Sequence, residues 1–256
     1  MRRFHLFELE DQPWFPVIVR DLATDYLQFI QTRFRLDRAM MPIIRRVLEQ
    51  SGATRIVDLC SGGSGPLLLL VKDLAAAGVP VCATLTDLFP NAAAFAEIAR
   101  ASDGLITYEA QPVDARDVPA RLSGLRTIFN GFHHLRPADA RAVLHAAAAV
   151  RQPIAILEVS ERSLRTLPVV LTPLFVWLLT PFMRPFLWRR LLWTYPLPLV
   201  PLTCLWDGMV SQLRAYTPAE LRQLCEGSAP MRWEAGQVPI AKGGGRLTYL
   251  IGIPAR

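Results

Sequence analysis

An apolar run that ends in an acidic residue and then breaks into glycines constrains this chain more than any other stretch. Residues 55–59 (RIVDL) are rich in apolar and β-branched side chains, as a buried parallel strand requires. The glycines that follow are Gly62, Gly63 and Gly65, and they let the backbone approach a ligand because they carry no Cβ. Pro66 suits the first turn of a helix over 66–77, whose free N–H groups and positive dipole end point back at the loop. The stretch therefore predicts a cradle for a nucleotide-type cofactor.

Short apolar runs alternate with alanine-rich segments from residue 55 onward, which predicts a doubly wound, mostly parallel α/β sheet. We expect parallel strands at 55–60, 81–87, 106–109, 127–130 and 154–158. We expect helices at 66–77, 91–99, 137–150 and 218–225, and a helix over 209–213 whose start is marked by Asp207. The runs 232–238 and 247–253 are joined by a link containing Gly243, Gly244 and Gly245, which favours an antiparallel pair.

The first 50 residues are expected to form a helical cap, and residues 51–256 a single α/β domain. Apolar residues at helical spacing predict cap helices at 20–33 and 40–50. Before them, an acidic and aromatic segment around Trp14 and Phe15 is broken by two prolines into an extended connection. This segment either closes a substrate pocket, where aromatic faces attract a cationic acceptor, or packs as an ordinary part of the cap.

Charge and cysteine usage narrow the classes of partner. The net charge is +6, but the basic residues are scattered without interleaved aromatics, so nucleic-acid binding is not expected. The four cysteines lack the spacing of a zinc site, which predicts reduced thiols, no metal and a cytoplasmic protein. The basic N-terminus runs at once into acidic residues at positions 8, 10 and 11, so no signal peptide is expected.

Residues 162–206 form an unusually apolar insertion after the fifth predicted strand. The runs 167–183 and 191–206 carry no charge, but prolines interrupt both, and each is shorter than the ~20 residues of a spanning helix. Between them lie Arg184, Arg189 and Arg190, and with the nearby aromatic residues Trp177, Trp188, Trp193 and Tyr195 they give a composition typical of interfacial segments. Three roles fit: a lid over an apolar substrate, which ranks first, a contact with the membrane surface, and a dimer interface. The chain is accordingly expected to be a monomer or a homodimer.

The order of these parts resembles the class I S-adenosylmethionine-dependent methyltransferases. The residues similar to the first motif of that family are Asp58, Cys60, Ser61, Gly62, Gly63 and Gly65. The resemblance implies a seven-stranded sheet with a terminal antiparallel strand, S-adenosylmethionine as cofactor, and methyl transfer as the reaction. Two positions depart from the motif, because Cys60 and Ser64 stand where glycines are usual.

Residues at the carboxyl ends of later strands extend the resemblance. Asp87 corresponds to the ribose-binding acid of the family, since a carboxylate only accepts hydrogen bonds and can take both hydroxyls. Leu88 would pack on the adenine, and Asp114 with Ala115 is similar to the clamp on the adenine amine. Asn130 ends the fourth strand, where the family faces the sulfonium. Open α/β sheets bind their ligands at this edge.

A nicotinamide-dependent dehydrogenase is the main competitor within this fold. Its fingerprint G-x-G-x-x-G/A would place Leu68 at the third glycine position, where helix packing needs a small residue. A pyrophosphate cradle is therefore disfavoured.

His133 and His134 are the candidate catalytic residues. They follow the fourth strand, and a neutral imidazole can take a proton from an oxygen or nitrogen nucleophile near pH 7. The structural alternative is that one packs at the sheet edge and the other caps the next helix. Glu158 ends the fifth strand at the same edge and is a candidate for substrate binding, together with His134, Trp14 and Phe15.

The residues and the resemblance predict an enzyme that moves the sulfonium methyl to a small, lipophilic acceptor. It is expected in the cytoplasm, and at the inner membrane surface if the insertion binds lipid. Methyl transfer is an in-line displacement on an activated donor, so alignment alone can suffice without a base. The alternative from another class is a non-catalytic protein that keeps the fold and uses the insertion for membrane attachment or assembly. An NAD(P)-dependent oxidoreductase ranks below both.

Overall fold

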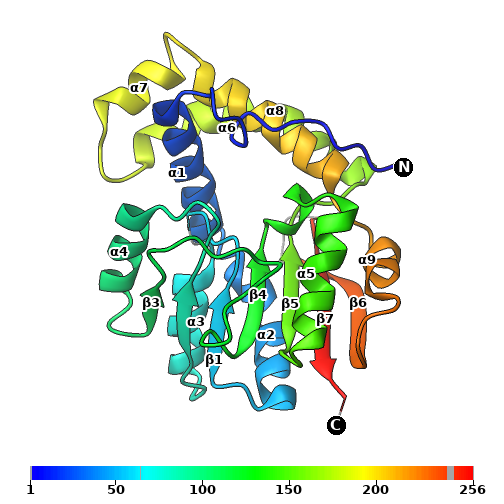
Figure 1. Cartoon of the computed structure of the whole chain (residues 1–256). Coiled ribbons are helices and arrows are strands. Elements are labelled where there is room, and N and C mark those ends of the chain that lie inside the picture. Colours follow the sequence, from blue (N-terminus) through cyan, green and yellow to red (C-terminus); the bar gives the residue numbers. More distant parts are fainter. Residues whose placement is uncertain (1, 64, 241–244, 256) are drawn as a thin grey trace.

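A computed structural model describes residues 2–63, 65–240 and 245–255, with the side chains of 164–167 left aside (Figure 1). Its described strands form one seven-stranded sheet in the order β3-β2-β1-β4-β5-β7-β6. Neighbouring strands from β3 to β5 are parallel, and β7 runs antiparallel to both β5 and β6. The predicted doubly wound sheet and the antiparallel final pair are confirmed. Ser64, Gly243 and Gly244 lie outside the described residues.

The strands are β1 (Arg55–Asp58), β2 (Cys82–Leu85), β3 (Ile106–Tyr108), β4 (Leu125–Phe129), β5 (Ile154–Glu158), β6 (Met231–Pro239) and β7 (Arg246–Pro254). The helices are α1 (Val17–Arg33), α2 (Asp37–Ser51), α3 (Leu67–Ala76), α4 (Ala92–Ala101), α5 (Pro137–Ala149), α6 (Thr172–Leu179), α7 (Trp188–Thr194), α8 (Leu199–Arg214) and α9 (Pro218–Cys225). Short 3₁₀ helices are η1 (Phe132–His134), η2 (Leu164–Leu171) and η3 (Thr180–Phe182). The first two strands end earlier than predicted; after β1 the chain turns at Cys60, whose φ is +55°.

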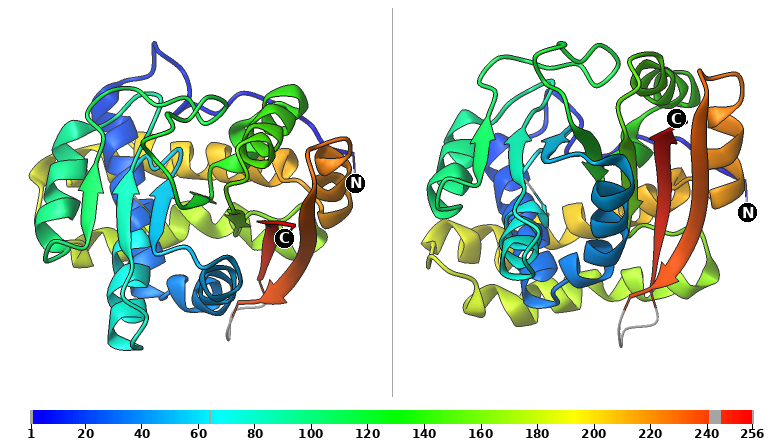
Figure 2. Two further views of the ribbon diagram at one scale, coloured as in Figure 1. Left: turned by 60° about the horizontal axis from the view of Figure 1, so that its bottom comes forward. Right: turned by 90° about the horizontal axis from the view of Figure 1, so that it is seen from below.

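Helices cover both faces of the sheet, so its central strands are buried from both sides (Figure 2). Buried side chains of α2, α3 and α4 pack on one face, and those of α5 and α9 pack on the other. Strands β4 and β5 are buried at every position. Of the two helices in the predicted N-terminal cap, α2 is thus a sheet helix, whereas α1 packs on α8.

The parallel register brings the carboxyl ends of the strands to one edge. Asp58 pairs with Leu85 of β2 and with Thr127 of β4, and Phe129 pairs with Leu157 of β5. Loops that leave these strands therefore start side by side, although they are far apart in the sequence. This edge is the one at which open α/β sheets bind ligands.

A third layer, formed by α1 and the insertion helices, lies above this edge (Figure 1). Its own apolar core joins Val19, Leu22 and Tyr26 of α1 to Val176, Met183 and Val200 of the insertion. The part of the chain described here has no helix with both the length and the apolar character needed to cross a membrane. The insertion is therefore folded as short helices, as its prolines predict.

Asp207 corrects one expectation from the sequence. It does not start a helix but lies in the middle of α8, buried against residues 9 and 10. Its carboxylate accepts hydrogen bonds from the backbone N–H groups of Leu9 (2.7 Å) and Glu10 (3.1 Å). An acidic side chain followed by glycine is a helix-start signal locally, but here a distant segment uses the carboxylate instead.

Candidate functional site at the carboxyl edge of the sheet

The glycine loop after β1 is a sharp turn built from left-handed residues. Cys60, Gly62 and Gly65 have φ values of +55°, +50° and +45°. Non-glycine residues rarely adopt this conformation, which explains why glycine would be expected at position 60. The loop after β4 passes close by, since a Cβ on Gly131 would lie 3.5 Å from the Cβ of Cys60. Burial raises the pKa of the Cys60 thiol to about 12, so the thiol is neutral.

Asp58 at the end of β1 holds this turn in place, and its side chain is buried. Its carboxylate accepts hydrogen bonds from Thr127 Oγ1 (2.6 Å) and Ser61 Oγ (2.7 Å). Burial raises its pKa to about 7, against the opposing effect of the two hydroxyl donors. Both donors are side-chain hydroxyls, so Asp58 fixes the loop through Ser61.

Asp87 lies beside the glycine loop, as predicted for a ribose-binding acid. Its Oδ2 accepts a hydrogen bond from Gly62 N (2.9 Å), and its Oδ1 accepts one from Phe89 N (2.9 Å). The side chain of Leu88 next to it is 43% exposed. The carboxylate and the loop amide therefore meet at one accessible point, where a ligand hydroxyl would find both an acceptor and a donor.

Asp114 and Asn130 hold the neighbouring loops. The Asp114 carboxylate is paired with Arg116 (2.7 Å), which lowers the pKa of that carboxyl, and Arg116 also reaches Asp139. Ala115 is buried next to it. Asn130 has a φ of +52°, which asparagine tolerates, and its Oδ1 accepts a hydrogen bond from Val159 N (2.7 Å). Asn130 thus ties the end of β4 to the end of β5.

The two histidines are joined to carboxylates from both sides. His133 Nδ1 lies 2.5 Å from Glu158 Oε2, and Glu158 Oε1 accepts the backbone N–H of Phe132 (2.7 Å). His134 Nδ1 lies 3.0 Å from Asp11 Oδ1. An ionised carboxylate only accepts hydrogen bonds, so each Nδ1 carries the proton and each Nε2 is turned elsewhere. Neither histidine caps α5, whose N-cap is Arg136 with no side-chain cap.

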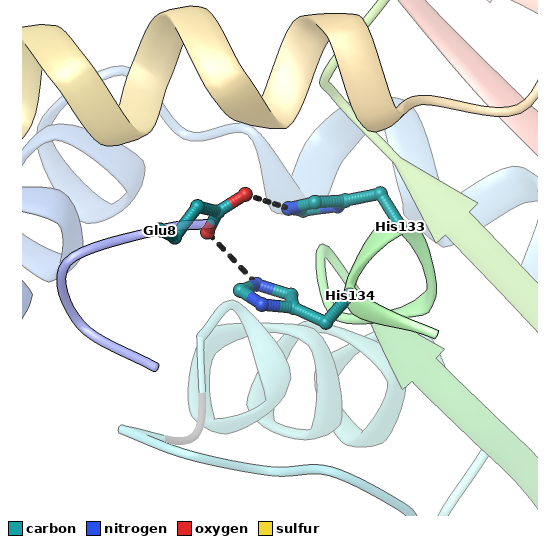
Figure 3. Close-up of side chains that lie close together, drawn as sticks. All are labelled: Glu8, His133 and His134. Carbon is teal, nitrogen blue, oxygen red and sulfur yellow. Dashed lines mark ion pairs between the residues drawn. The ribbon is translucent and has the colours of Figure 1, made fainter. Parts of the chain in front are cut away.

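Both Nε2 atoms point toward Glu8, which arrives from the N-terminal segment (Figure 3). His133 Nε2 lies 3.9 Å from Glu8 Oε1, and His134 Nε2 lies 3.5 Å from Glu8 Oε2. Arg214 at the end of α8 lies 3.2 Å from Glu8 and 2.8 Å from Asp11. We call Glu8, Asp11, His133, His134, Glu158 and Arg214 the imidazole–carboxylate cluster.

The charges of this cluster decide which histidine can accept a proton. Burial disfavours the cation of His134, but the hydrogen bond with Asp11 and the charge of Glu8 outweigh burial and raise its pKa to about 9. His134 and Arg214 in turn hold the pKa of Asp11 well below its usual range, against the effect of burial. His134 is therefore a cation at neutral pH and cannot act as a general base there.

Within the described residues, Glu8, His133 and His134 are the set whose atoms can hold a metal ion, since these atoms lie within 4.8 Å of one another. Arg214 and the His134 cation already supply positive charge to Glu8. A divalent ion would have to replace a proton on His134 and sit next to the guanidinium. The prediction of no metal stays a prediction.

The N-terminal segment was expected to border the substrate pocket through Trp14 and Phe15, but the pairing of its acidic residues with the histidines and Arg214 was not predicted. Residues 3–11, here called the strap, run along α8: Phe4 N donates to Leu213 O (3.1 Å), and Trp206 Nε1 donates to Phe7 O (3.1 Å). The acidic residues of the strap were visible in the sequence, but nothing local pairs them with an arginine more than 200 positions away. Trp14 is 67% exposed, whereas Phe15 is buried in the third-layer core, which fits packing better than contact with substrate.

Helix α1 connects the third layer to the glycine loop. A Cβ on Gly63 would lie 2.9 Å from Thr24 Cγ2, and Gln28 Nε2 donates to Gly63 O (3.4 Å). The third layer therefore lies above both the glycine-loop cradle and the imidazole–carboxylate cluster.

No protein-family model matches the sequence, and no curated protein is significantly similar to it. Solved structures do share its fold. The plantazolicin methyltransferase BpumL, solved in complex with SAH, is 11% identical with a TM-score of 0.55, over 96% of this chain and 94% of that one. Human N-acetylserotonin methyltransferase, solved with SAM, is 15% identical with a TM-score of 0.51, over 96% of this chain but 60% of that one. A putative O-methyltransferase from Nostoc punctiforme is 12% identical with a TM-score of 0.53, over 98% and 64%. The chain therefore has the Rossmann-like fold of the class I methyltransferases.

Proposed function

We propose that this protein is an S-adenosylmethionine-dependent methyltransferase that acts on a small, lipophilic acceptor. One observation carries the proposal: the carboxylate of Asp87 meets the amide of Gly62 at the turn of a glycine loop, at the edge where this fold binds its ligands. Structures of the same fold solved with SAM and SAH support this choice of cofactor. When bound, the cofactor supplies a methyl group activated on a sulfonium.

The residues of the edge suit the parts of such a cofactor. Asp87 would accept the ribose hydroxyls, and the Gly62 N–H that it now holds would be free to bind the ligand. Leu88 offers an exposed apolar side chain for the adenine ring. Asp114 would take the adenine amine only if Arg116 yields part of its present ion pair, so we expect this contact to contribute less. Asn130, with Gly131 against Cys60, would border the sulfonium end.

We assign proton removal from the acceptor to His133. The Nδ1–H donates to Glu158, which fixes the tautomer and leaves Nε2 as the proton acceptor, the arrangement of a general base held by a carboxylate. Because Nε2 faces Glu8 Oε1 at 3.9 Å, the acceptor hydroxyl would have to enter between these two atoms. The cation of His134 and the charge of Arg214 stabilise the negative oxygen atoms of Glu8 and Asp11 and thereby position the strap. An acceptor that must lose a proton, such as a hydroxyl, fits this arrangement.

The lipophilic acceptor is inferred from the third layer. This layer is built from α1 and the insertion, and the insertion runs 167–183 and 191–206 carry no charge. A non-catalytic protein that only uses the insertion for assembly is less favoured, because it has no use for a buried cluster of charged groups. Such clusters are costly to bury and concentrate at functional sites.

Calorimetry and methyl transfer test the proposal separately. We expect S-adenosylhomocysteine to bind in the micromolar range, and Asp87→Ala to weaken it about a hundredfold, because two charge-assisted hydrogen bonds are lost. Asp117→Ala, in the same sheet-edge region but outside the predicted contacts, serves as the control and should bind normally. The proposed cofactor would be overturned if neither S-adenosylmethionine nor S-adenosylhomocysteine binds at millimolar concentration.

The acceptor is sought with the full chain and S-adenosylmethionine carrying a labelled methyl group, presented with lipophilic alcohols and phenols. His133→Ala should lower kcat about a hundredfold or more while S-adenosylhomocysteine affinity stays unchanged. His134→Gln should retain more activity at neutral pH, since that residue positions the strap. A variant at His133 with unchanged kcat would show that alignment alone drives the transfer.

A further inference from the structure

The insertion exposes most of the large apolar side chains that the molecule leaves in water. Of the 24 such side chains among the described residues, 13 lie between positions 170 and 202. They are Val170, Leu171, Leu174, Phe175, Trp177, Leu178, Phe182, Phe186, Trp188, Tyr195, Leu197, Leu199 and Leu202. We call this set the insertion surface. Scattered apolar residues are ordinary on a protein surface, but a concentration of this size marks an interaction site.

The inner side of the insertion is already occupied by its own packing. In α6 only Val176 is buried, in the third-layer core, while Leu174, Phe175, Trp177 and Leu178 remain exposed. The polar atoms of the aromatic residues are satisfied internally, since Trp177 Nε1 donates to Thr194 O (2.9 Å) and the Tyr195 hydroxyl donates to Trp177 O (2.7 Å). The exposed surface is therefore not a gap in the fold but a second, outward apolar side.

The charges that the insertion itself supplies have a single sign. Asp25 and Asp21 of α1 lie near its Arg190 and Arg189. Residues 163–206 contain four arginines and no aspartate or glutamate. Arg190 is buried and paired with Asp25 (2.9 Å), which leaves Arg184 and Arg189 exposed beside Phe182, Phe186 and Trp188. Exposed aromatic rings next to arginines suit the boundary between anionic headgroups and acyl chains. A second copy of the chain would have to bring these like charges together, which disfavours self-association.

The dimensions of the insertion fit a surface contact. Helices α6 and α7 have 8 and 7 residues, and no described helix of the chain can span a bilayer. Interfacial segments bury their apolar side only ~5–10 Å below the headgroups, which a single layer of aromatic side chains can reach. The membrane would thus contact the exposed surface of the third layer, the same layer that lies above the sheet edge.

We propose that the insertion surface docks on anionic phospholipid membranes, with Phe182, Phe186 and Trp188 in the interface and Arg184 and Arg189 at the phosphates. This contact does not depend on methyl transfer: it can exist without the proposed function, and the proposed function without it. It gives a lipophilic acceptor a short route from the bilayer to the sheet edge.

Flotation of the full chain with vesicles tests the proposal. With about one third anionic phospholipid we expect the protein to float, and with purely zwitterionic vesicles to float at least tenfold less. The triple variant Phe182→Ser, Phe186→Ser, Trp188→Ser should reduce partitioning at least a hundredfold, because each buried aromatic contributes about tenfold or more. Arg184→Gln with Arg189→Gln should remove the preference for anionic lipid and leave the weak binding to zwitterionic vesicles.

A matched control uses apolar side chains that are equally exposed elsewhere. Phe34 and Val150 are 61% and 54% exposed and lie outside the insertion, so Phe34→Ser with Val150→Ser should float like the wild type. Far-UV circular dichroism and S-adenosylhomocysteine binding check that the triple variant is folded. The proposal is overturned if the wild type stays at the bottom with anionic vesicles. It is equally overturned if sedimentation shows a dimer that the triple variant dissociates, since the surface then binds a second copy.

Discussion

The glycine-loop cradle and the imidazole–carboxylate cluster lie at one sheet edge but are built in different ways. The cradle is made by adjacent strand ends and by backbone geometry: Cys60, Asp58 and Asp87 are brought together by the parallel register. The cluster is made by side chains from segments at opposite ends of the chain, such as Asp11 and Arg214. The cradle therefore belongs to the sheet, whereas the cluster exists only while the strap is held on α8. The two regions should respond separately to mutation and pH.

Removal of the Arg214 side chain should destabilise the protein strongly, with the effect confined to the cluster. The guanidinium is buried, donates to Leu6 O (2.7 Å), and is paired with Glu8 and Asp11. Arg214→Leu leaves these carboxylates with the His134 cation alone and should lower the free energy of unfolding by about 3 kcal/mol. Denaturant titration measures this change. S-Adenosylhomocysteine affinity should stay within about threefold, since the described residues show no hydrogen bond or ion pair between Arg214 and the cradle.

An exposed arginine provides the control for Arg214. Arg45 forms a surface pair with Glu49, four residues along the same helix. Arg45→Leu should therefore change the free energy of unfolding by no more than about 0.5 kcal/mol. If Arg214→Leu abolishes S-adenosylhomocysteine binding in protein that is still folded, the cradle and the cluster are not separable and the comparison fails.

Asp58 should give the cradle its own pH dependence. Its pKa is about 7 in the folded protein because the carboxyl is buried, whereas the usual value is 3.8. Between these pH values the native state holds a proton that the unfolded state has released, so folding loses stability as pH rises from about 4 to 7. In the wild type this loss should amount to on the order of 2 to 4 kcal/mol in the free energy of unfolding, and it should be absent in Asp58→Asn. The difference in free energy of unfolding between wild type and variant, measured across this pH range, gives its size. Asp114→Asn is the control, because the pKa of Asp114 is lowered and lies below this pH range. A difference that grows in the opposite direction with pH would contradict the assignment.

The left-handed turn at Cys60 should be sensitive to branching at Cβ. Valine is a poor fit at a φ of +55°, so Cys60→Val should lower the free energy of unfolding by about 2 kcal/mol. Cys82 is exposed in β2, where valine is favourable, so Cys82→Val should change it by less than about 0.5 kcal/mol. Equal effects of the two substitutions would mean that the loop relaxes around the new side chain.

The same comparison explains what the sequence could and could not predict. Local patterns were sufficient for the sheet, because alternating apolar strands and capped helices such as α9 (Thr217 with Glu220) are set by neighbours in the chain. Asp58 and Asp87 were predictable because strand ends in a parallel sheet must meet at one edge. Glu8, Asp11 and Arg214 were not, because their pairing depends on where the strap crosses α8. Asp207 was misassigned for that reason, since its partners, Leu9 and Glu10, are almost 200 positions away.

His134 should show the smallest effect, and the one that best separates the strap from the cradle. Its pKa is raised to about 9, against a usual 6.5, because its bond to Asp11 and the charge of Glu8 outweigh burial. For a base with a raised pKa, the stabilisation is fully present below pH 6.5 and is lost as pH rises through 9. The free energy difference between wild type and His134→Gln should fall from about 1 kcal/mol at pH 6 to nearly zero at pH 10, allowing for the partial exposure of the imidazole.

His5→Gln is the control for His134 between about pH 7.5 and 10: the pKa of His5 is lowered to about 4 by burial and by Arg214, so this side chain is neutral in both the native and the unfolded state there. Limited chymotrypsin digestion identifies the part that detaches. Cleavage between residues 4 and 15 should accelerate above pH 9 in the wild type, while S-adenosylhomocysteine still protects the rest of the chain. If the cleavage rate is flat from pH 7 to 10, the strap is not held by a charged His134, and the cluster must be held mainly by Arg214.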